Sequence, residues 1–231
     1  MSILKKTARL VLASGLLLST SVPFAAAGQL NRFALTPSKE AIEFIANPGE
    51  ANDIQITASG TINNWIVRFD DPAAVIGGPI PGGCVHPFGN PNVVVCQSIF
   101  RDLEVHADLG DLDDVLLWTD STFPKSDDAA VIALGGSGDD VLESDPASTF
   151  ALTFDGGIDH DTLIGSDSAD TLRGSGGDDL IDGRGGEDTL QGGFGKDELR
   201  ANDGGTADLV HCGFGVDTFA VDGADTTVMC P

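Results

Sequence analysis

The chain has 231 residues and a formal net charge of −24, and 29 of its 36 acidic residues are Asp. A surface this negative repels the phosphates of nucleic acids and anionic lipid headgroups, so we exclude binding to nucleic acids and to membrane surfaces. Asp is a poor helix former, which argues against a helical bundle. The hydrophobic content of 41% is enough for a folded core and excludes a disordered acidic tail.

Residues 1–27 have the features of a secretory signal peptide. Three basic residues precede the apolar stretch Leu10–Val22, and a run of small residues predicts cleavage after Ala27. The apolar stretch has about 13 residues where roughly 20 are needed to cross a bilayer, so we expect no membrane span. The sequence therefore predicts a secreted, extracellular protein.

The four cysteines of an exported chain predict two disulfides. Three connectivities are possible, and the local pairing Cys84–Cys96 and Cys212–Cys230 is the most economical. A zinc site is the competing interpretation, but no CxxC or HxxxH spacing supports it.

Residues 28–134 form the first predicted region after the signal peptide, and their pattern is all-β. Apolar residues alternate with polar ones in four segments, which turn-forming residues separate. These segments are residues 41–45, 53–57, 65–69 and 103–106. The proline-rich stretch over residues 77–92 predicts a loop, which the Cys84–Cys96 disulfide would hold against a strand over residues 93–95.

Residues 135–231 form the second predicted region, which has a net charge of −17 and contains 20 of the 30 glycines. A nine-residue unit of the form G-G-x-G-x-D-x-U-x, where U is apolar, begins at Gly135 and returns at Gly156 after an insertion over residues 144–155. It then continues without a gap to Arg200, and weaker copies follow; one more precedes the block around Asp114. The Asp residues at the sixth position from Gly135 onward are Asp140, Asp161, Asp170, Asp179, Asp188, Asp197, Asp208 and Asp217.

The unit itself predicts a solenoid. Consecutive glycines allow the backbone to turn, and the remaining residues can form a short strand with one inward side chain. A single unit cannot bury that side chain, so the units must stack, with two units in each 18-residue coil and strands about 4.8 Å apart. Carboxylates of alternate units would then stack along two edges: Asp161, Asp179 and Asp197 on one, and Asp170, Asp188 and Asp208 on the other.

Stacked carboxylates repel one another unless a cation neutralises them. Carboxylate and carbonyl oxygens, without imidazole or thiolate, suit Ca²⁺ with six to eight oxygen ligands, and they suit Mg²⁺ less well. The sequence therefore predicts several bound Ca²⁺ ions. The alternative is a metal-free solenoid in which each Asp caps a turn through local hydrogen bonds.

The nonapeptide block resembles the RTX (repeats-in-toxin), hemolysin-type calcium-binding repeat family. The resemblance covers residues 135–220 and says little about residues 28–108. It implies an all-β fold with a right-handed parallel β-roll in the C-terminal region 135–231, and we expect the β-rich region 28–134 to continue the solenoid. It implies Ca²⁺ held between successive turns. The ligands that it implies, besides the eight sixth-position Asp residues, are turn carbonyls at Gly136, Gly138, Gly174, Gly177, Gly183, Gly186, Gly192 and Gly195.

The repeats also depart from the family pattern. Asp159 and Ser168 replace glycine at the fourth position, and Ser166, Ser175 and Arg184 replace it at the second. Asp197 and Asp208 are 11 residues apart, so we expect a two-residue bulge between them.

The last disulfide also follows from the predicted coil. Cys212 and Cys230 are 18 residues apart, so their Cα atoms would stack near about 4.8 Å. Thr226 falls at the sixth position of the last coil, and we expect the disulfide to replace an ion there.

The predicted function is calcium binding that drives folding outside the cytoplasm, in a monomer of the small exported bacterial branch of the family. No catalytic motif occurs, so we expect no enzyme, and no motif indicates a protein or glycan partner. Two alternatives remain open. One is a secreted hydrolase with its active site in residues 28–134 and the roll as a stability tail; the other is a surface adhesin or matrix protein with the roll as a spacer.

Overall fold

The computed structural model describes residues 29–36, 39–61, 64–72, 76, 83–87, 90–98, 102–120 and 130–231. The expected signal peptide over residues 1–27 lies outside this part of the chain. The described residues form strands and turns. They include no helix that is long and apolar enough to cross a membrane.

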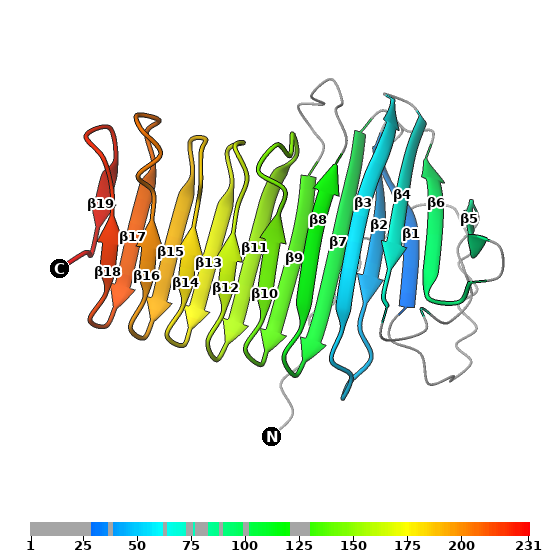
Figure 1. Cartoon of the computed structure of the whole chain (residues 1–231), viewed down its shortest axis with the longest axis horizontal. Helices are drawn as coiled ribbons and strands as arrows, with labels where there is room; N and C mark the ends of the chain where they lie inside the picture. Colours follow the sequence, from blue (N-terminus) through cyan, green and yellow to red (C-terminus); the bar gives the residue numbers. More distant parts are fainter. Residues whose placement is uncertain are drawn as a thin grey trace.

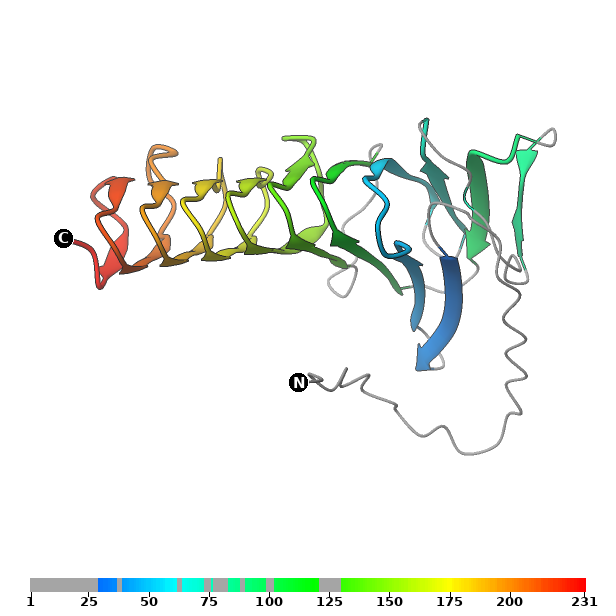
Figure 2. The same cartoon turned by 90° about the horizontal axis from the view of Figure 1, so that it is seen from below.

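Two long sheets lie face to face along the molecule (Figures 1 and 2). In the described residues, sheet 1 consists of β1 (Gln29–Thr36), β2 (Lys39–Ile45), β7 (Asp102–Asp111), β9 (Ala130–Ser137), β11 (Ala151–Ile158), β13 (Thr171–Gly176), β15 (Thr189–Phe194), β17 (Leu209–Phe214) and β19 (Thr226–Val228). Sheet 2 consists of β18 (Thr218–Ala220), β16 (Glu198–Arg200), β14 (Leu180–Asp182), β12 (Thr162–Ile164), β10 (Val141–Ser144), β8 (Val115–Asp120), β3 (Asp53–Thr61), β4 (Asn64–Asp70), β6 (Val93–Ser98) and β5 (Cys84–Val85).

From β7 to β19 the chain alternates between the two sheets, and all neighbouring strands in this part are parallel. The pairing of Leu172 with Leu190 and of Leu163 with Ile181 shows a coil of 18 residues. The all-β, parallel β-roll predicted from the nine-residue repeat is thereby confirmed. Sequential coils follow one another along the long axis toward the C-terminus (Figure 2).

The core between the sheets is built from one apolar side chain per repeat. Successive side chains of a strand alternate between faces, so the central residue of each three-residue strand of sheet 2 points inward, and so does the second residue of the six-residue strands β13 and β15. The side chains at these positions are fully buried: Leu163, Leu172, Ile181, Leu190 and Leu199. Each contributes about 1.5–3 kcal/mol of hydrophobic stabilisation, which no isolated coil could obtain.

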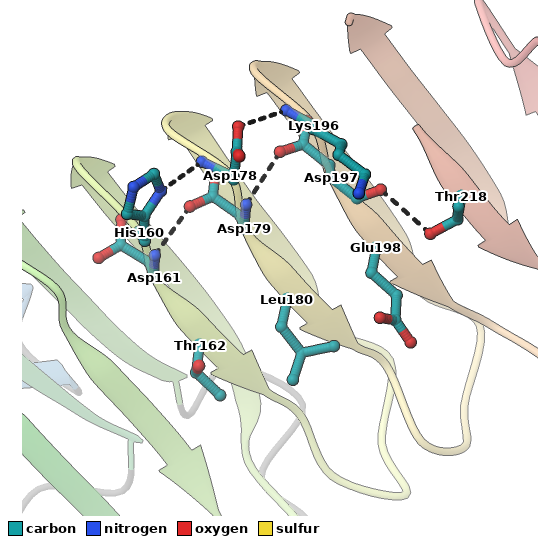
Figure 3. A pocket seen from close by; sticks show the side chains of 10 residues that line it. All are labelled: His160, Asp161, Thr162, Asp178, Asp179, Leu180, Lys196, Asp197, Glu198 and Thr218. Carbon is teal, nitrogen blue, oxygen red and sulfur yellow. Dashed lines mark hydrogen bonds between the residues drawn. The ribbon is translucent and has the colours of Figure 1, made fainter. Parts of the chain in front are cut away.

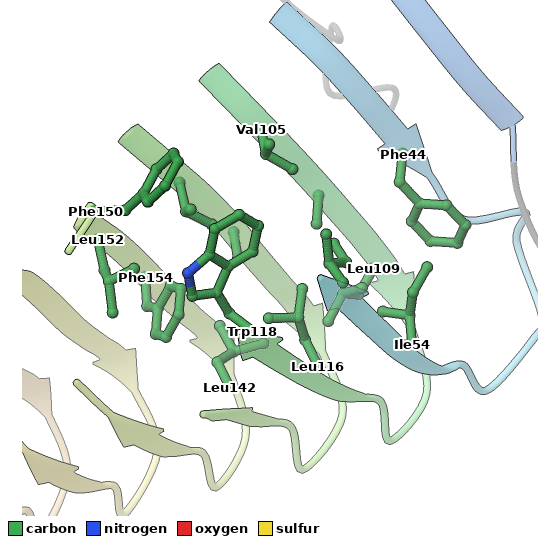
Figure 4. Packing of buried hydrophobic residues seen from close by; sticks show 14 of the residues in the cluster. Phe44, Ile54, Val105, Leu109, Leu116, Trp118, Leu142, Phe150, Leu152 and Phe154 are labelled. Atoms are coloured by element: carbon green, nitrogen blue, oxygen red, sulfur yellow. The ribbon is translucent and has the colours of Figure 1, made fainter. Parts of the chain in front are cut away.

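The segment over residues 144–155, expected as an insertion, completes a coil instead. It leaves sheet 2 after β10, turns, and enters sheet 1 as β11. Phe150 is 2% exposed and packs edge-on against Trp65 and Trp118, with ring centroids 5.5 and 5.1 Å apart. Figure 4 shows Phe150 and Trp118. Phe154, which pairs with Leu172, occupies the leucine position of this coil, and Phe150 adds a second buried ring from the turn before β11.

The predicted continuation of the solenoid into the N-terminal region holds for one further coil. Strand β2 pairs in parallel with β7, and β3 pairs in parallel with β8. Beyond that coil, β1, β4 and β6 extend the sheets in antiparallel orientation. The expected boundary at residue 135 falls within β9, and sheet 1 runs through it without interruption.

The loop expected over residues 77–92 contains a short strand, so that part of the prediction is wrong. Cys84 and Val85 form β5, because they pair in antiparallel orientation with β6. Cys84 lies directly opposite Cys96, and the two form the predicted disulfide. The bridge fixes β5 at the outer edge of sheet 2.

Cys212 and Cys230 also form the predicted disulfide, with their Cα atoms 4.9 Å apart. The prediction that Thr226 occupies the sixth position of this coil is wrong, however. Thr226 pairs with Leu209, which follows the sixth-position Asp208, so Asp225 occupies that position. Asp208 and Asp225 are 17 residues apart, one fewer than the predicted 18. The Asp pattern therefore continues to the end of the roll.

Candidate metal centre

The sixth-position Asp residues lie at the turns between the sheets, in two rows that we call the first and second ladders. The first ladder follows the turns from sheet 1 to sheet 2 and comprises Asp114, Asp140, Asp161, Asp179, Asp197 and Asp217. The second ladder follows the turns from sheet 2 to sheet 1 and comprises Asp170, Asp188, Asp208 and Asp225. The structure thus brings together Asp161, Asp179 and Asp197, and separately Asp170, Asp188 and Asp208, as the spacing predicted.

One hydrogen bond repeats along both ladders. The backbone N–H of each ladder Asp donates to Oδ1 of the ladder Asp in the next coil, as from Asp161 to Asp179 at 2.9 Å and from Asp170 to Asp188 at 2.8 Å. Figure 3 shows Asp161, Asp179 and Asp197 on successive turns. These bonds fix each carboxylate in the stack and leave its second oxygen for another partner.

That second oxygen, Oδ2, is buried and has no hydrogen-bond partner in most rungs of the ladders. Asp161, for example, is 2% exposed. The ladder residues with such an Oδ2 are Asp114, Asp140, Asp161, Asp179, Asp188, Asp197 and Asp208. A buried carboxylate oxygen without a partner is costly, and a bound cation would remove that cost.

No group of three or more Asp, Glu, His or Cys side chains in the described residues is placed to hold a metal ion. A site on either ladder therefore needs backbone carbonyl oxygens as well as carboxylates. Ca²⁺ accepts such mixed oxygen ligands, so the donor set fits it.

A glycine at the first position of each repeat makes room for the ladder carboxylate. A Cβ atom added there would lie closer than 3.0 Å to Oδ2 of the Asp in the same repeat. This holds for Gly135, Gly156, Gly165, Gly174, Gly183 and Gly192. Gly174, Gly183 and Gly192, predicted only as carbonyl ligands, therefore also have a steric role.

The other predicted glycines lie in left-handed turns. Gly136, Gly138, Gly177, Gly186 and Gly195 have φ between 112° and 142°. A Cβ atom at Gly177 or at Gly195 would collide with a carbonyl oxygen of the preceding turn. The turns therefore stack closely, with carbonyl oxygens between them.

Three of the predicted departures from glycine also adopt left-handed backbone. Asp159, Ser175 and Arg184 have φ of 83°, 78° and 62°, at a cost of about 1–2 kcal/mol each. The expected two-residue bulge lies in the exposed turn before Asp208, and Asp208 still accepts the Asp188 N–H at 2.8 Å.

The fifth position forms an outer row on the same turns as the first ladder. The Asp139 carboxylate accepts the N–H of His160, the His160 ring accepts the N–H of Asp178, and the Asp178 carboxylate accepts the N–H of Lys196. His160, Asp178 and Lys196 line a pocket beside the ladder (Figure 3). The outer row therefore contains basic residues as well as acids, unlike the ladder itself.

Asp170 differs from most ladder residues because the protein satisfies both of its oxygens, as it also does for Asp225 at the end of the roll. The backbone N–H and the hydroxyl of Ser166 donate to Asp170 Oδ2 at 2.7 and 2.9 Å. The Arg184 guanidinium donates to the carbonyls of Ser144 and Gly165 at 2.5 and 3.0 Å. At the turn of Asp170, the N–H and hydroxyl of Ser166 therefore donate to the Oδ2 atom, which has no partner in most other ladder residues.

We expect Ser166→Ala to destabilise the protein in EDTA by about 1–2 kcal/mol, because Asp170 Oδ2 loses a hydroxyl donor. The same variant should gain more stability from added Ca²⁺ than the parent does. Thermal unfolding with EDTA and with Ca²⁺ measures both effects. Ser175→Ala is the control, since the Ser175 hydroxyl bonds Asp155 away from the ladders. Equal effects of the two substitutions would contradict this role of Ser166.

Without a bound cation, burial raises the pKa of eight ladder carboxyls: Asp114, Asp140, Asp161, Asp170, Asp179, Asp188, Asp197 and Asp208. Desolvation is the largest cause, and the charges of neighbouring ladder residues add to it for Asp161 and Asp188. The pKa rises to about 6 for Asp140, to about 7 for Asp161 and to about 8 for Asp188. Without a cation, the folded protein therefore holds protons that the unfolded chain releases at lower pH.

We expect the protein in EDTA to lose stability as pH rises from about 4 to about 8, because a raised carboxyl pKa stabilises the fold only while the group is protonated. Thermal unfolding at about pH 5 and about pH 8 measures this trend. In millimolar Ca²⁺ the trend should reverse, since protons then compete with the cation. A Tm in EDTA that rises with pH over this range would contradict the assignment.

Asp225 is a ladder residue that the sequence pattern missed. Its Oδ1 accepts the Asp208 N–H at 3.1 Å. The turn before it has lost the glycine spacing, and Thr227 replaces the inward leucine, so no complete unit marks it. The remaining signal is the order Asp, any residue, then a β-branched residue.

Comparison with known families gives one match. The sequence model of the RTX calcium-binding nonapeptide repeat (4 copies) matches residues 155–190 and 182–219. The matched residues contain the first ladder from Asp161 to Asp217 and the second ladder from Asp170 to Asp208. No curated protein and no solved structure matches the chain.

Proposed function

We propose, on the premise that residues 155–219 are RTX calcium-binding nonapeptide repeats, that the protein is a secreted β-roll that folds when it binds several Ca²⁺ ions. The observation that supports this most strongly is the series of buried Oδ2 atoms without partners. They belong to carboxylates held one above another by a repeated backbone hydrogen bond. When its carboxyls are ionised, such a series is stable only with positive charge between the rungs.

The residues that would hold the ions are the ladder Asp side chains and the carbonyls of the glycine turns. Bound Ca²⁺ supplies the positive charge that the ladders lack. The first-position glycines leave the space beside Oδ2, and the left-handed glycines let successive turns approach. Because the unfolded chain has no such stack, the free energy of binding becomes free energy of folding.

We place folding outside the cytoplasm. The two disulfides fit an oxidising compartment, and residues 1–27 have the pattern of an export signal. Extracellular calcium modules bind at about 10⁻⁴–10⁻³ M, so the roll would stay loose until it reaches calcium-rich surroundings. The proposal assigns no catalytic role to the chain.

Asp179→Asn tests the proposal. The substitution keeps the shape of the side chain but removes the charge next to the predicted ion. We expect fewer bound Ca²⁺ ions by equilibrium dialysis and a lower Tm in Ca²⁺. Asp178→Asn is the matched control, because Asp178 is exposed and its Oδ1 accepts the Lys196 N–H, which the amide oxygen can still do. A parent protein that binds no Ca²⁺ would refute the proposal, as would equal stoichiometry in parent and Asp179→Asn.

A further inference from the structure

The first ladder extends past the matched repeats into the N-terminal part of the chain. The turn over residues 109–114 stacks on the turn over residues 135–140, since Gly110 pairs with Gly136 and the Asp114 N–H donates to Asp140 Oδ1 at 2.8 Å. The Asp114 carboxylate in turn accepts the N–H of Asn52 at 2.5 Å. Asn52 therefore occupies the next rung of the ladder, on the connection between β2 and β3.

The oxygens at this end of the ladder are buried and lack partners. Asp114 is fully buried, Asp140 is 1% exposed and Asn52 is 3% exposed. Oδ2 of Asp114, Oδ2 of Asp140 and Oδ1 of Asn52 have no hydrogen-bond partner. The Asn52 amide is held in place, because its Nδ2 donates to the Glu50 carbonyl and to Asp114 Oδ1, both at 3.0 Å. Three orphaned oxygens thus belong to three successive rungs.

The backbone of the turn over residues 109–114 has the form of a calcium-binding repeat without its glycine sequence. Gly110 is left-handed at φ 99°. Leu112 is also left-handed, at φ 74°, although its Cβ atom disfavours that conformation, and its side chain is exposed. A Cβ atom at Gly136 or Gly138 would collide with the carbonyl of Gly110 or of Leu112. The carbonyls of this turn therefore approach the next turn as they do in the repeats.

The charge around these oxygens is negative. The turns at residues 109–114 and 135–140 contain five Asp residues and no Lys or Arg. At the adjacent rungs Asn52 and Asp114 the side-chain donors are a neutral amide oxygen and a carboxylate oxygen, which together with turn carbonyls are the ligands that Ca²⁺ prefers.

We propose that Asn52 and Asp114, on adjacent rungs, form a further Ca²⁺ site outside the matched repeats, which joins the N-terminal coil β2–β3 to the roll. Asp140 lies one rung beyond Asp114, too far from Asn52 to share that ion. The inference rests on the proposed function, since it assumes that the ladders bind calcium. It adds a consequence: the parallel coil of the N-terminal region becomes part of the calcium-dependent fold. The core at this junction is continuous, with Ile54, Leu109 and Leu116 packed together (Figure 4).

Asp114→Asn tests this site in the full chain, with Asp113→Asn as the matched control. Asp113 lies in the same turn and has the same charge, but it is exposed, and its Oδ1 accepts the Asp139 N–H as an amide oxygen also would. We expect Asp114→Asn to bind one Ca²⁺ fewer than the parent by equilibrium dialysis, and Asp113→Asn to bind the same number. Equal numbers for the parent and Asp114→Asn would overturn the site while leaving calcium binding by the repeats intact.

A measurement on the parent keeps the proposal testable if Asp114→Asn does not fold. Long-wavelength anomalous diffraction from crystals grown with Ca²⁺ locates each bound ion directly. We expect a peak beside Asp114 in addition to peaks along the repeats. Peaks along the repeats with none beside Asp114 would overturn this site alone, whereas no peak anywhere would overturn the proposed function as well.

Discussion

Replacing Gly174 with Ala should strongly weaken calcium-dependent folding. The new Cβ would lie closer than 3.0 Å to the Asp179 carboxylate and to the Gly192 carbonyl. Backbone strain does not contribute, since Gly174 is not in the left-handed region. Overpacking of this kind costs about 1–3 kcal/mol, and the displaced carboxylate would also lose calcium affinity. Thermal unfolding and calcium titration of the variant measure the two effects.

Gly176→Ala is the control for this prediction. Gly176 lies on the same strand, β13, and a Cβ atom there would meet only the Gly157 carbonyl oxygen at an ordinary 3.8 Å. We expect this control to match the parent in stability and in calcium affinity. If Gly174→Ala and Gly176→Ala behaved alike, the steric role of the first-position glycine would be wrong.

Removing the Cys212–Cys230 disulfide should also have a large effect. The bridge holds the last coil, whose strand β19 is exposed at all three residues and pairs with β17 only. Closing a loop of this length stabilises a protein by about 3 kcal/mol. The Cys212→Ala/Cys230→Ala double variant should therefore unfold at a lower temperature in Ca²⁺.

Hydrogen exchange distinguishes local from global loss in this variant. We expect residues 226–228 to lose protection first, because β19 is the edge strand of sheet 1 and without the bridge only its pairing with β17 would hold it. Cys84→Ala/Cys96→Ala is the comparison, since it removes a bridge at the opposite end of the molecule. Unchanged protection of β19 in the first variant would show that the disulfide does not hold the coil.

The repeat region could be predicted from the sequence because each repeat makes the same contacts. A leucine every nine residues can be buried only if the coils stack, and stacking then fixes the positions of Asp161, Asp179 and Asp197. The two disulfides are the local pairing, the most economical of the three connectivities that the sequence left open. The prediction is wrong where the period changes. The spacing of 18 residues puts Thr226 at the sixth position of the final coil, but that coil is one residue shorter and Asp225 occupies the position.

The N-terminal part could be predicted only in outline. Alternating apolar residues identify strands, but they do not specify which strands pair or in which direction. The antiparallel placement of β4 and β6 depends on contacts between distant residues, such as Trp65 with Phe150. Asn52 gave no signal as a ladder residue, since its rung is recognisable only from the hydrogen bond to Asp114.

Circular dichroism of the purified protein, first in EDTA and then in millimolar Ca²⁺, tests the central claim most directly. The ladders require a cation to neutralise them, so we expect a weak β signal and a low Tm in EDTA. Added Ca²⁺ should produce a large gain in both, and Mg²⁺ at the same concentration should produce much less. The same spectrum and the same Tm with EDTA and with Ca²⁺ would contradict calcium-driven folding of the roll.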